Sequence, residues 1–473
     1  MYKRFLAAAL VLGAIVALFV NPLGLSLQIG DSAKPISVTA QAKDLTLVCP
    51  GALYRAGGSS GTSLQVTRAG SATLSGFFAS NPSIRLVERR VVADAPLVAG
   101  LVNGPLVDAK SITVQDPSGS AVQGSALLAV TQVQKAALSN LSGLAAANCV
   151  RPSSDNWLVG GDTSPGRETL LILSNPTDVD SSVNLEIIGS GGTVSAPGLS
   201  SISVPKSKTT VIPISGVAPN LSTFAIHIVS SGGALGTWLQ VRTMRGLLPG
   251  GVELVGPSAE PAKSLVIPGI FLRGLADAAK LSADNPAYAD LTPTLRISST
   301  ATTQTTVTAQ IVGTNAKTYG TVIQQVIAPN STMDIPITGL ADGDYVALID
   351  SSEPVRAAIR FNRTKAKKTD LAWAPAVSPL KNKVVFNAPA GAISKLAIAN
   401  PGKVGATVRV GSQTVTVPAA SSVSVVAPAG RSATISSTVP VAATEVIDVG
   451  GLVAVIPVLD YKNLGGQLSI LVR

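Results

Sequence analysis

The sequence predicts an all-β protein, built as tandem immunoglobulin-like β-sandwich modules that follow one N-terminal transmembrane helix. Short runs of alternating apolar and polar residues, separated by Ser-, Gly- and Asn-Pro-containing turns, recur along most of the 473 residues. Charged residues make up 13 % and aromatic residues 4 %, so uncharged polar side chains must cover the surface, as in many exported β-proteins. One long apolar run follows a basic N-terminus.

Residues 1–43 are predicted to form a cytoplasmic tip, a transmembrane signal anchor and a linker. Residues 5–20 are uninterrupted and apolar, and if Pro22 is tolerated the span extends to Ile29, long enough to cross a bilayer. The alternative is secretion after cleavage at Ala40-Gln41-Ala42, although that site lies about 20 residues beyond the apolar run. Both readings place the body outside the cytoplasm, and the first makes it a single-pass protein of the cell membrane.

Residues 44–150 are predicted to form a lead-in β-domain closed by a disulfide. Cys49 and Cys149 are the only cysteines, and in an exported chain such a pair is most simply a disulfide. A thiol nucleophile or a metal pair would need histidine or other soft ligands nearby, and the chain has one histidine. Residues 133–144, rich in Ala, Leu and Ser, read either as a short helix or as a continuation of the preceding strand.

Three further β-sandwich modules are expected at residues 151–270, 271–380 and 381–473. Each repeats one order: a strand, an Asn-Pro or Ser-Thr turn, a strand, a Pro-containing edge, a strand with a second Pro, Gly, and two strands around a Ser-rich corner. Roughly seven short strands per unit fit a two-sheet sandwich. The prolines fall at strand ends, where the loss of a ladder donor costs least. No βαβ spacing is visible, which disfavours parallel α/β folds.

The net charge of +10 has two interpretations: it only aids solubility, which is the simpler one, or it attracts an anionic partner such as wall polymer or lipid headgroups. The candidate anion-binding residues form one basic run: Arg360, Arg363, Lys365, Lys367 and Lys368. Arg242, Arg245 and Arg273 could extend the basic face. The alternative is a solvated loop. Nucleic acid is not expected, because there is no basic helix, zinc ligand set or stacking platform.

The sequence offers little catalytic chemistry. Asp162, in Gly-Gly-Asp-Thr-Ser, superficially resembles an aspartic-protease loop but has no partner motif, and a turn that caps backbone N–H groups is expected instead. His227 falls within a strand and lacks an evident nucleophile. The other acidic candidates are interpreted as turn residues, too few for a calcium site: Asp284, Asp342, Asp344 and Glu253. No cofactor or metal is expected.

Several short motifs carry a family resemblance. They are Cys49-Pro-Gly51, Cys149 shortly before Trp157-Leu-Val-Gly-Gly161, Leu171-Ile-Leu-Ser-Asn-Pro176 and Val266-Ile-Pro-Gly269. Their order resembles a family of exported, membrane-anchored actinobacterial proteins known only as a domain of unknown function. The resemblance implies a membrane-anchored extracytoplasmic β-protein and carries over no catalytic residue.

We therefore expect a non-enzymatic extracytoplasmic scaffold or binding protein of the cell envelope. Its partners would be the membrane, through the N-terminal helix, and an anionic wall polymer or another envelope protein. Two alternatives stay open. One is an accessory subunit of a membrane-bound envelope glycosyltransferase or transporter. The other is a carboxylate-only enzyme such as a glycosidase, which would need paired acids converging in a cleft.

Overall fold

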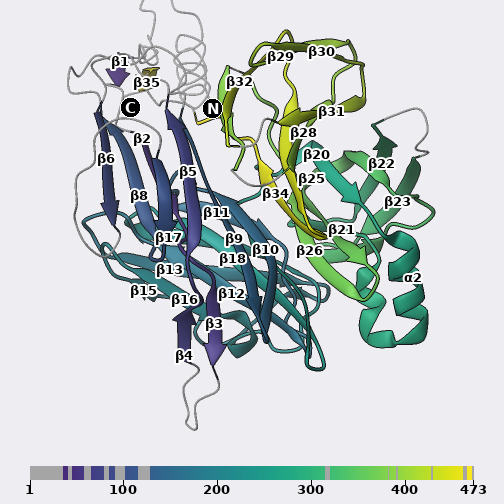
Figure 1. Cartoon of the computed structure of the whole chain (residues 1–473). Helices are drawn as coiled ribbons and strands as arrows, with labels where there is room; N and C mark the ends of the chain where they lie inside the picture. The colour runs from purple at the N-terminus through teal and green to yellow at the C-terminus, as the bar shows by residue number, and fades with distance from the viewer. Residues whose placement is uncertain are drawn as a thin grey trace, which may run out of the picture. The chain divides into compact units, whose positions relative to one another are not determined.

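The computed structural model describes residues 36–40, 45–57, 65–78, 85–90, 102–115, 128–314, 320–381, 383–389, 393–427, 430–461 and 466–470. Strands dominate this part of the chain (Figure 1), which confirms the all-β class. Two compact units are present, residues 1–42 with 464–473 and residues 43–463. In the first, β1 (Ile36–Ala40) pairs antiparallel with β35 (Gly466–Ile470). The expected transmembrane segment, residues 5–29, lies outside the described residues, and none of the helices that are described has the length and apolar character of a membrane span.

The larger unit begins with two antiparallel sheets and a hairpin. One sheet has the order β2 (Leu45–Cys49), β8 (Lys110–Gln115), β6 (Arg85–Arg90), and the other β10 (Leu141–Asn148), β9 (Leu128–Leu138), β5 (Ala72–Phe78), β7 (Val102–Leu106). The hairpin is β3 (Tyr54–Gly57) with β4 (Gln65–Arg68). Apolar side chains of both sheets form one core, and Cys49 and Cys149 lie within it.

Residues 133–144 form no helix: they lie in the β9–β10 hairpin. Alternate residues of β10 enter two different cores, Ala145 and Ala147 on one side and Leu144 and Ala146 on the other. Because both faces of β10 are covered, the sequence shows no apolar–polar alternation there. The Ala-rich sequence was therefore compatible with either a helix or a strand.

The next nine strands form two more antiparallel sheets. The first has β11 (Asp155–Val159), β17 (Phe224–Gly232), β13 (Ser181–Gly189) and β14 (Gly192–Thr193), with β15 (Ile202–Val204) also on β13. The second has β16 (Thr209–Pro213), β12 (Arg167–Ser174), β18 (Gly236–Arg245) and β19 (Leu248–Val255). The short 3-10 helix η1 spans Ile214–Gly216.

A seven-stranded sheet follows, organised by one long strand, β25 (Gly343–Lys365). The sequence had indicated two strands here, separated by a Ser-rich corner. The backbone stays extended through that corner, so the first half of β25 pairs with one set of neighbours and the second half with another. The other strands are β20 (Ala262–Leu272), β21 (Thr294–Ser299), β22 (Thr305–Gly313), β23 (Thr321–Ile327), β24 (Ser331–Pro336) and β26 (Lys368–Pro375).

Helix α2 (Leu275–Asp284) and the 3-10 helix η2 (Pro286–Leu291) connect β20 to β21. The sequence analysis did not predict them. The final strands form two sheets of four: β27 (Val384–Asn387), β32 (Ser432–Ser437), β29 (Ala406–Val410), β30 (Gln413–Val417), and β31 (Ser421–Ala427), β28 (Ile393–Asn400), β33 (Ala442–Val449), β34 (Leu452–Pro457).

The strands of the larger unit fall into four consecutive groups, β2–β10, β11–β19, β20–β26 and β27–β34. The last strand of each group meets the others along a common axis. β10 contacts β19, β19 contacts β26, β26 contacts β34, and β34 contacts β10. Each has a ladder partner on one side only, so each brings an open strand edge to the junction. An open edge carries unpaired N–H and C=O groups, which must find partners when buried. We call this junction the four-strand axis.

Candidate functional site

A single carboxylate holds the four-strand axis together. Asp370, on β26, is completely buried. Its two oxygens accept backbone N–H groups from all four strands: Leu144 of β10 (3.0 Å), Val252 of β19 (3.4 Å), Leu371 of β26 (3.0 Å) and Val453 of β34 (3.1 Å). One N–H group of each open edge is therefore satisfied by this side chain rather than by ladder pairing.

Two glycines leave room for this carboxylate. A Cβ at Gly143 or at Gly251 would press against Asp370 Oδ1 and nearby backbone atoms. Both glycines have positive φ, at 150° and 128°, which L side chains rarely adopt. We infer that these glycines are required by the close approach of the strands to Asp370.

A second buried carboxylate, Glu253, occupies the next level of the axis. Its Oε1 accepts N–H groups from Ala146 at 3.2 Å and Leu254 at 2.9 Å, each two residues beyond an N–H donor of Asp370. The interpretation of Glu253 as a turn residue is therefore wrong, because it lies within β19 and is fully buried. Burial raises the pKa of Asp370 to about 8, and burial likewise raises the pKa of Glu253 well above its usual value.

The four hairpins that lead into the axis turn at the same end of it. Their turns lie at residues 139–140, 246–247, 366–367 and 450–451. The four strands of the axis begin at Leu141, Leu248, Lys368 and Leu452. These residues precede the N–H groups that donate to Asp370 by three, four, three and one residues, respectively. At about 3.3 Å per residue, three of the hairpins project roughly 10–13 Å beyond the Asp370 level. We call these four turns and the residues flanking them the hairpin end.

The predicted anion-binding run divides into two parts at the hairpin end. Lys365, Lys367 and Lys368 are exposed at the β25–β26 turn. Arg360 is largely buried, its Nη2 donates to Thr294 Oγ1 at 3.3 Å, and burial lowers its pKa. Arg363 pairs with Asp448 at 3.4 Å. Thus three lysines face solvent, and the two arginines are engaged within the fold.

The additional arginines proposed from the sequence are in ion pairs. Arg242 pairs with Glu168 at 2.8 Å, Arg245 is bidentate on Asp290 at 2.8 and 2.9 Å, and Arg273 pairs with Asp344. These contacts hold neighbouring elements together, so the arginines do not extend the exposed basic face.

The interpretation of Asp284 and Asp344 as turn residues is also wrong, because they lie in α2 and β25. Asp342 and Asp344 have structural partners. Asp342 accepts the N–H groups of Gly274 (2.8 Å) and Leu275 (2.9 Å), which begin α2. Asp344 lies between Arg273 and Lys395. Among the described residues no group of side chains has the arrangement of a metal site.

An open cleft of about 580 Å³ lies between residues 162–167, the β18–β19 turn and η2. It contains the predicted Asp162 turn, and Asp162 Oδ1 accepts from the N–H of Ser164 at 2.8 Å as expected. Asp290, on the facing wall, is held by Arg245 and by Arg167 at 3.0 Å. Both carboxylates are thus engaged by neighbouring groups.

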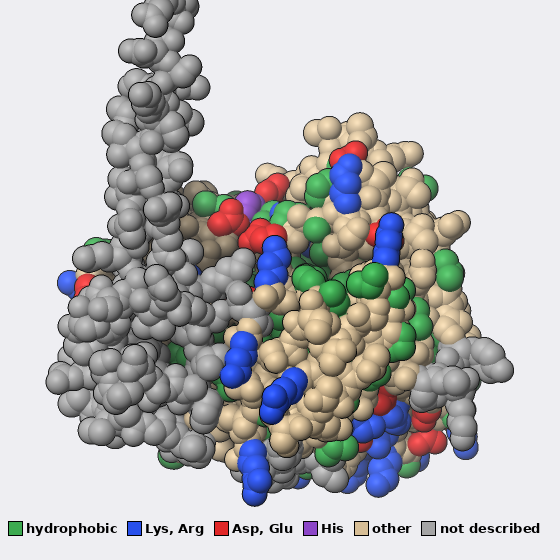
Figure 2. All heavy atoms as spheres, turned by 90° about the horizontal axis from the view of Figure 1, so that it is seen from above, with side chains coloured by type: hydrophobic (Ala, Val, Ile, Leu, Met, Phe, Trp, Pro, Cys, Tyr) green, Lys and Arg blue, Asp and Glu red, His purple; other side chains and the backbone are tan. Residues whose placement is uncertain are grey.

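The one histidine belongs to a stack at the other end of the axis. His227 lies flat on Trp157 with ring centroids 4.1 Å apart, and the Arg356 guanidinium covers the Trp157 ring at 3.3 Å. His227 Nε2 lies 3.0 Å from Asp155 and Nδ1 3.6 Å from Glu186. Figure 2 shows acidic side chains around the histidine on this face. Burial lowers the pKa of Arg356 to about 10, although nearby carboxylates oppose the change.

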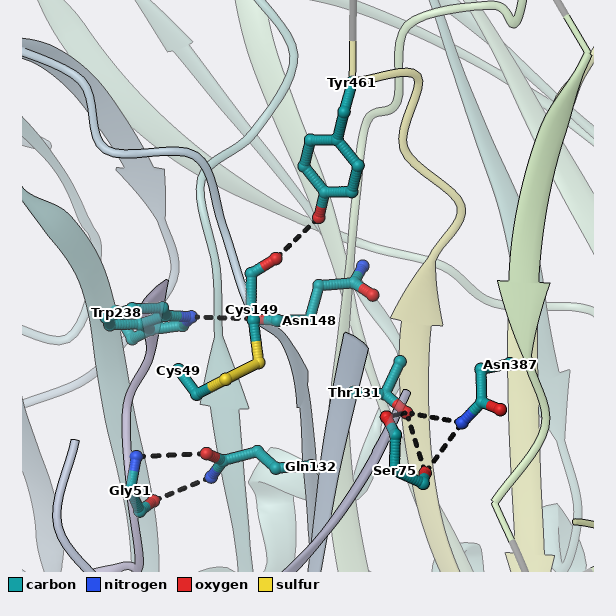
Figure 3. Close-up of a disulfide and its surroundings, with 10 residues drawn as sticks. All are labelled: Cys49, Gly51, Ser75, Thr131, Gln132, Asn148, Cys149, Trp238, Asn387 and Tyr461. Atoms are coloured by element: carbon teal, nitrogen blue, oxygen red, sulfur yellow. Dashed lines mark hydrogen bonds between the residues drawn. A yellow bond between two sulfur atoms is a disulfide. The ribbon is translucent and has the colours of Figure 1, made fainter. Parts of the chain in front are cut away.

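The predicted disulfide is confirmed. Cys49, at the end of β2, bonds to Cys149, which follows β10 (Figure 3). The Tyr461 hydroxyl donates to the Cys149 carbonyl at 2.6 Å, and Trp238 Nε1 donates to the Asn148 carbonyl at 3.3 Å. The end of the axis opposite the hairpin end is therefore fastened both covalently and by hydrogen bonds.

Comparison with known proteins identifies the family. A model described as "Family of unknown function (DUF5719)" matches residues 102–438, so the chain belongs to that family. A search of curated proteins found no match. The resemblance inferred from the short motifs is confirmed as membership of a family of unknown function.

Sequence reasoning did not single out Asp370 and assigned Glu253 to a turn, so it missed the role of both central residues of the four-strand axis. Glu253 lies within an apolar stretch, Val252-Glu-Leu-Val255, whereas Asp370 stands between a basic run and an apolar one, Lys367-Lys-Thr-Asp-Leu-Ala-Trp373. A lone acid in a strand that is otherwise apolar is a signal for a buried, hydrogen-bonded carboxylate. That signal was present for Glu253, but apart from the next residue in the chain the partners of each acid come from strands more than 80 residues away.

Proposed function

We propose that this protein is a non-enzymatic, extracytoplasmic scaffold of the cell envelope that binds an anionic envelope component through the hairpin end. In this proposal the four groups of strands are immunoglobulin-like sandwich modules behind one N-terminal transmembrane helix. The phosphate-bearing wall polymer and lipid headgroups share the chemistry that lysines recognise.

The observation that carries the proposal is the exposed lysine turn between β25 and β26. Lys365, Lys367 and Lys368 lie on a hairpin whose second strand belongs to the four-strand axis, whereas Arg242, Arg245 and Arg363 nearby are in ion pairs. Because the hairpin backbone is already folded, binding has to order only the three lysine side chains. The acids of the axis are buried, so they support a structural role for it.

The test is binding of the full-length protein, in zwitterionic detergent, to a soluble polyanion such as polyphosphate across a salt series. We expect binding that weakens as salt rises, and the triple change K365E/K367E/K368E should reduce affinity by at least about tenfold. The control is K206E/K208E/K403E, which reverses three exposed lysines elsewhere in the body. Equal affinity of both triple variants would refute the role of the hairpin end.

A further inference from the structure

The hairpin end carries exposed leucines beside its lysines. Leu247 is 91 % exposed and Leu248 60 % exposed at the β18–β19 turn, and Leu138, on the adjacent β9–β10 hairpin, is 42 % exposed. Leu247 is the most exposed of the large hydrophobic residues in the described part of the chain. Exposed apolar side chains that lie together on a surface commonly mark an interaction site.

Hydrogen bonds join the hairpins that carry these leucines and the lysines. Arg242, on β18, donates from Nη1 to the carbonyl of Asn140 in the β9–β10 turn, which joins two of the hairpins. Arg245 donates from Nη1 to Thr369 Oγ1 at 2.9 Å, which joins the β18–β19 hairpin to the lysine-bearing one. The leucine and lysine turns are therefore held side by side by hydrogen bonds near their bases.

The shape of this surface distinguishes between kinds of partner. The leucines stand on projecting turns and not in a groove, so they suit a fluid apolar medium better than a folded partner with a matching cavity. A phosphate-bearing polymer would satisfy the lysines but would leave the leucines in water. A bilayer with anionic headgroups satisfies both, because apolar side chains can enter its boundary region by about 5–10 Å while lysines remain at the headgroups.

The acidic groups at this end do not cancel the lysines. Asp448 and Glu168 are paired with Arg363 and Arg242. Asp277 is exposed and accepts the N–H of Ala366 at 2.7 Å, so it shapes the lysine turn from beneath. At this turn the three exposed lysines therefore outnumber the exposed carboxylate of Asp277.

We propose that the hairpin end docks on an anionic lipid bilayer, with Leu247 and Leu248 entering the headgroup boundary and Lys365, Lys367 and Lys368 contacting headgroup phosphates. This rests on the proposed function and names the bilayer as the partner of the same surface. Cys149 and Tyr461 lie at the opposite end of the axis, beyond the eight residues of β10 and so about 25 Å away. The docking surface is therefore distinct from the end of the axis that carries Cys149 and Tyr461.

The test uses the full chain, and its apolar N-terminal segment is placed in a nanodisc so that this segment cannot itself insert into the added vesicles. The protein is reconstituted into phosphatidylcholine nanodiscs, and vesicles with or without phosphatidylglycerol are added and separated by flotation. We expect the nanodiscs to float with anionic vesicles only. L247S/L248S should lower this recruitment by at least about tenfold, as should K365E/K367E/K368E.

Matched controls separate the inference from the proposed function. V322S/V326S removes two other exposed apolar side chains, at 63 % and 46 % exposure, and should leave recruitment unchanged. Recruitment of L247S/L248S equal to the wild type would overturn bilayer docking. So would the absence of recruitment of the wild type, even if it still binds polyphosphate, in which case the proposed function would stand with a polymer as partner.

Discussion

Asp370 connects four separate stretches of sequence through the atoms of one side chain. Its acceptors are shared among N–H groups of β10, β19, β26 and β34, each of which would otherwise be a buried donor without a partner. Leaving a buried donor unsatisfied costs about 1–3 kcal/mol. The residue therefore contributes to stability mainly through the penalty that its absence would impose on its neighbours.

The first prediction concerns the pH dependence of stability. Burial raises the pKa of Asp370 and of Glu445 to about 8, whereas both titrate near 4 when unfolded. Between about pH 4 and pH 8 the folded state therefore holds protons that the unfolded state has released. The free energy of unfolding should fall as pH rises through this window, by up to ~1.4 kcal/mol per pH unit for each group. Urea unfolding at pH 5.5 and pH 8 measures this.

The variant D370N is the control for that prediction. Asparagine has the shape of the protonated acid but does not titrate. In this variant the free energy of unfolding should therefore fall less steeply with pH, by the contribution of one titrating group. A wild-type stability that rises between pH 5.5 and pH 8, or a D370N slope equal to that of the wild type, would contradict the assignment.

At the scale of elements, helix α2 depends on a residue that is distant in sequence. Its N-cap, Gly274, is in the left-handed region and offers no side-chain cap. The carboxylate of Asp342 instead accepts the N–H groups of Gly274 and Leu275, and its charge is favourable at a helix N-terminus.

The second prediction is that D342A weakens α2. The loss of the remote cap should cost about 1 kcal/mol of stability and should speed amide hydrogen exchange within Leu275–Asp284. The matched control is D284A, which removes an exposed acid from the C-terminal end of the same helix and should not destabilise it. If exchange in α2 is equally fast in D342A and the wild type, the capping role of Asp342 is refuted.

The long strand β25 illustrates what can be inferred about elements from sequence. Both of its halves were expected from their alternation, because alternation reports which side chains face a core. The continuity of the strand through residues 351–354 was not expected, because a Ser-Ser-Glu-Pro sequence is compatible with both an extended segment and a turn. Pairing on both sides of the segment decided between them.

At the scale of the whole molecule, the chain is fastened at the end of the axis opposite the hairpins. The Cys49–Cys149 bond joins β2 to the end of β10 across a sequence separation of 100 residues, and both cysteines are fully buried. The bond therefore fixes the first sheets to the strand that enters the four-strand axis.

The third prediction is a large loss of stability in C49A/C149A. Closing a loop of about 100 residues stabilises a fold by about 4–5 kcal/mol in the chain-entropy model. The variant should show a lower denaturation midpoint than the oxidised wild type. Because the bond is buried, reductant should affect the folded wild type slowly, which serves as the internal control. An unchanged midpoint would show that hydrogen bonds such as that of Tyr461 hold this end without the disulfide.

The sequence by itself determined the all-β class, the cysteine pair, the capping turn at Asp162 and the lysines of the β25–β26 turn. Each of these follows from local pattern or from simple counting of residue types. Only the tertiary structure decided that four hairpins share one axis, that Asp370 and Glu253 bind its strand edges, and that leucines from one hairpin lie beside lysines from another. The physical reason is that an open strand edge carries the same N–H and C=O groups whatever its sequence. Which edges meet is therefore set by the packing of the sheets, and it leaves little local trace in the residues.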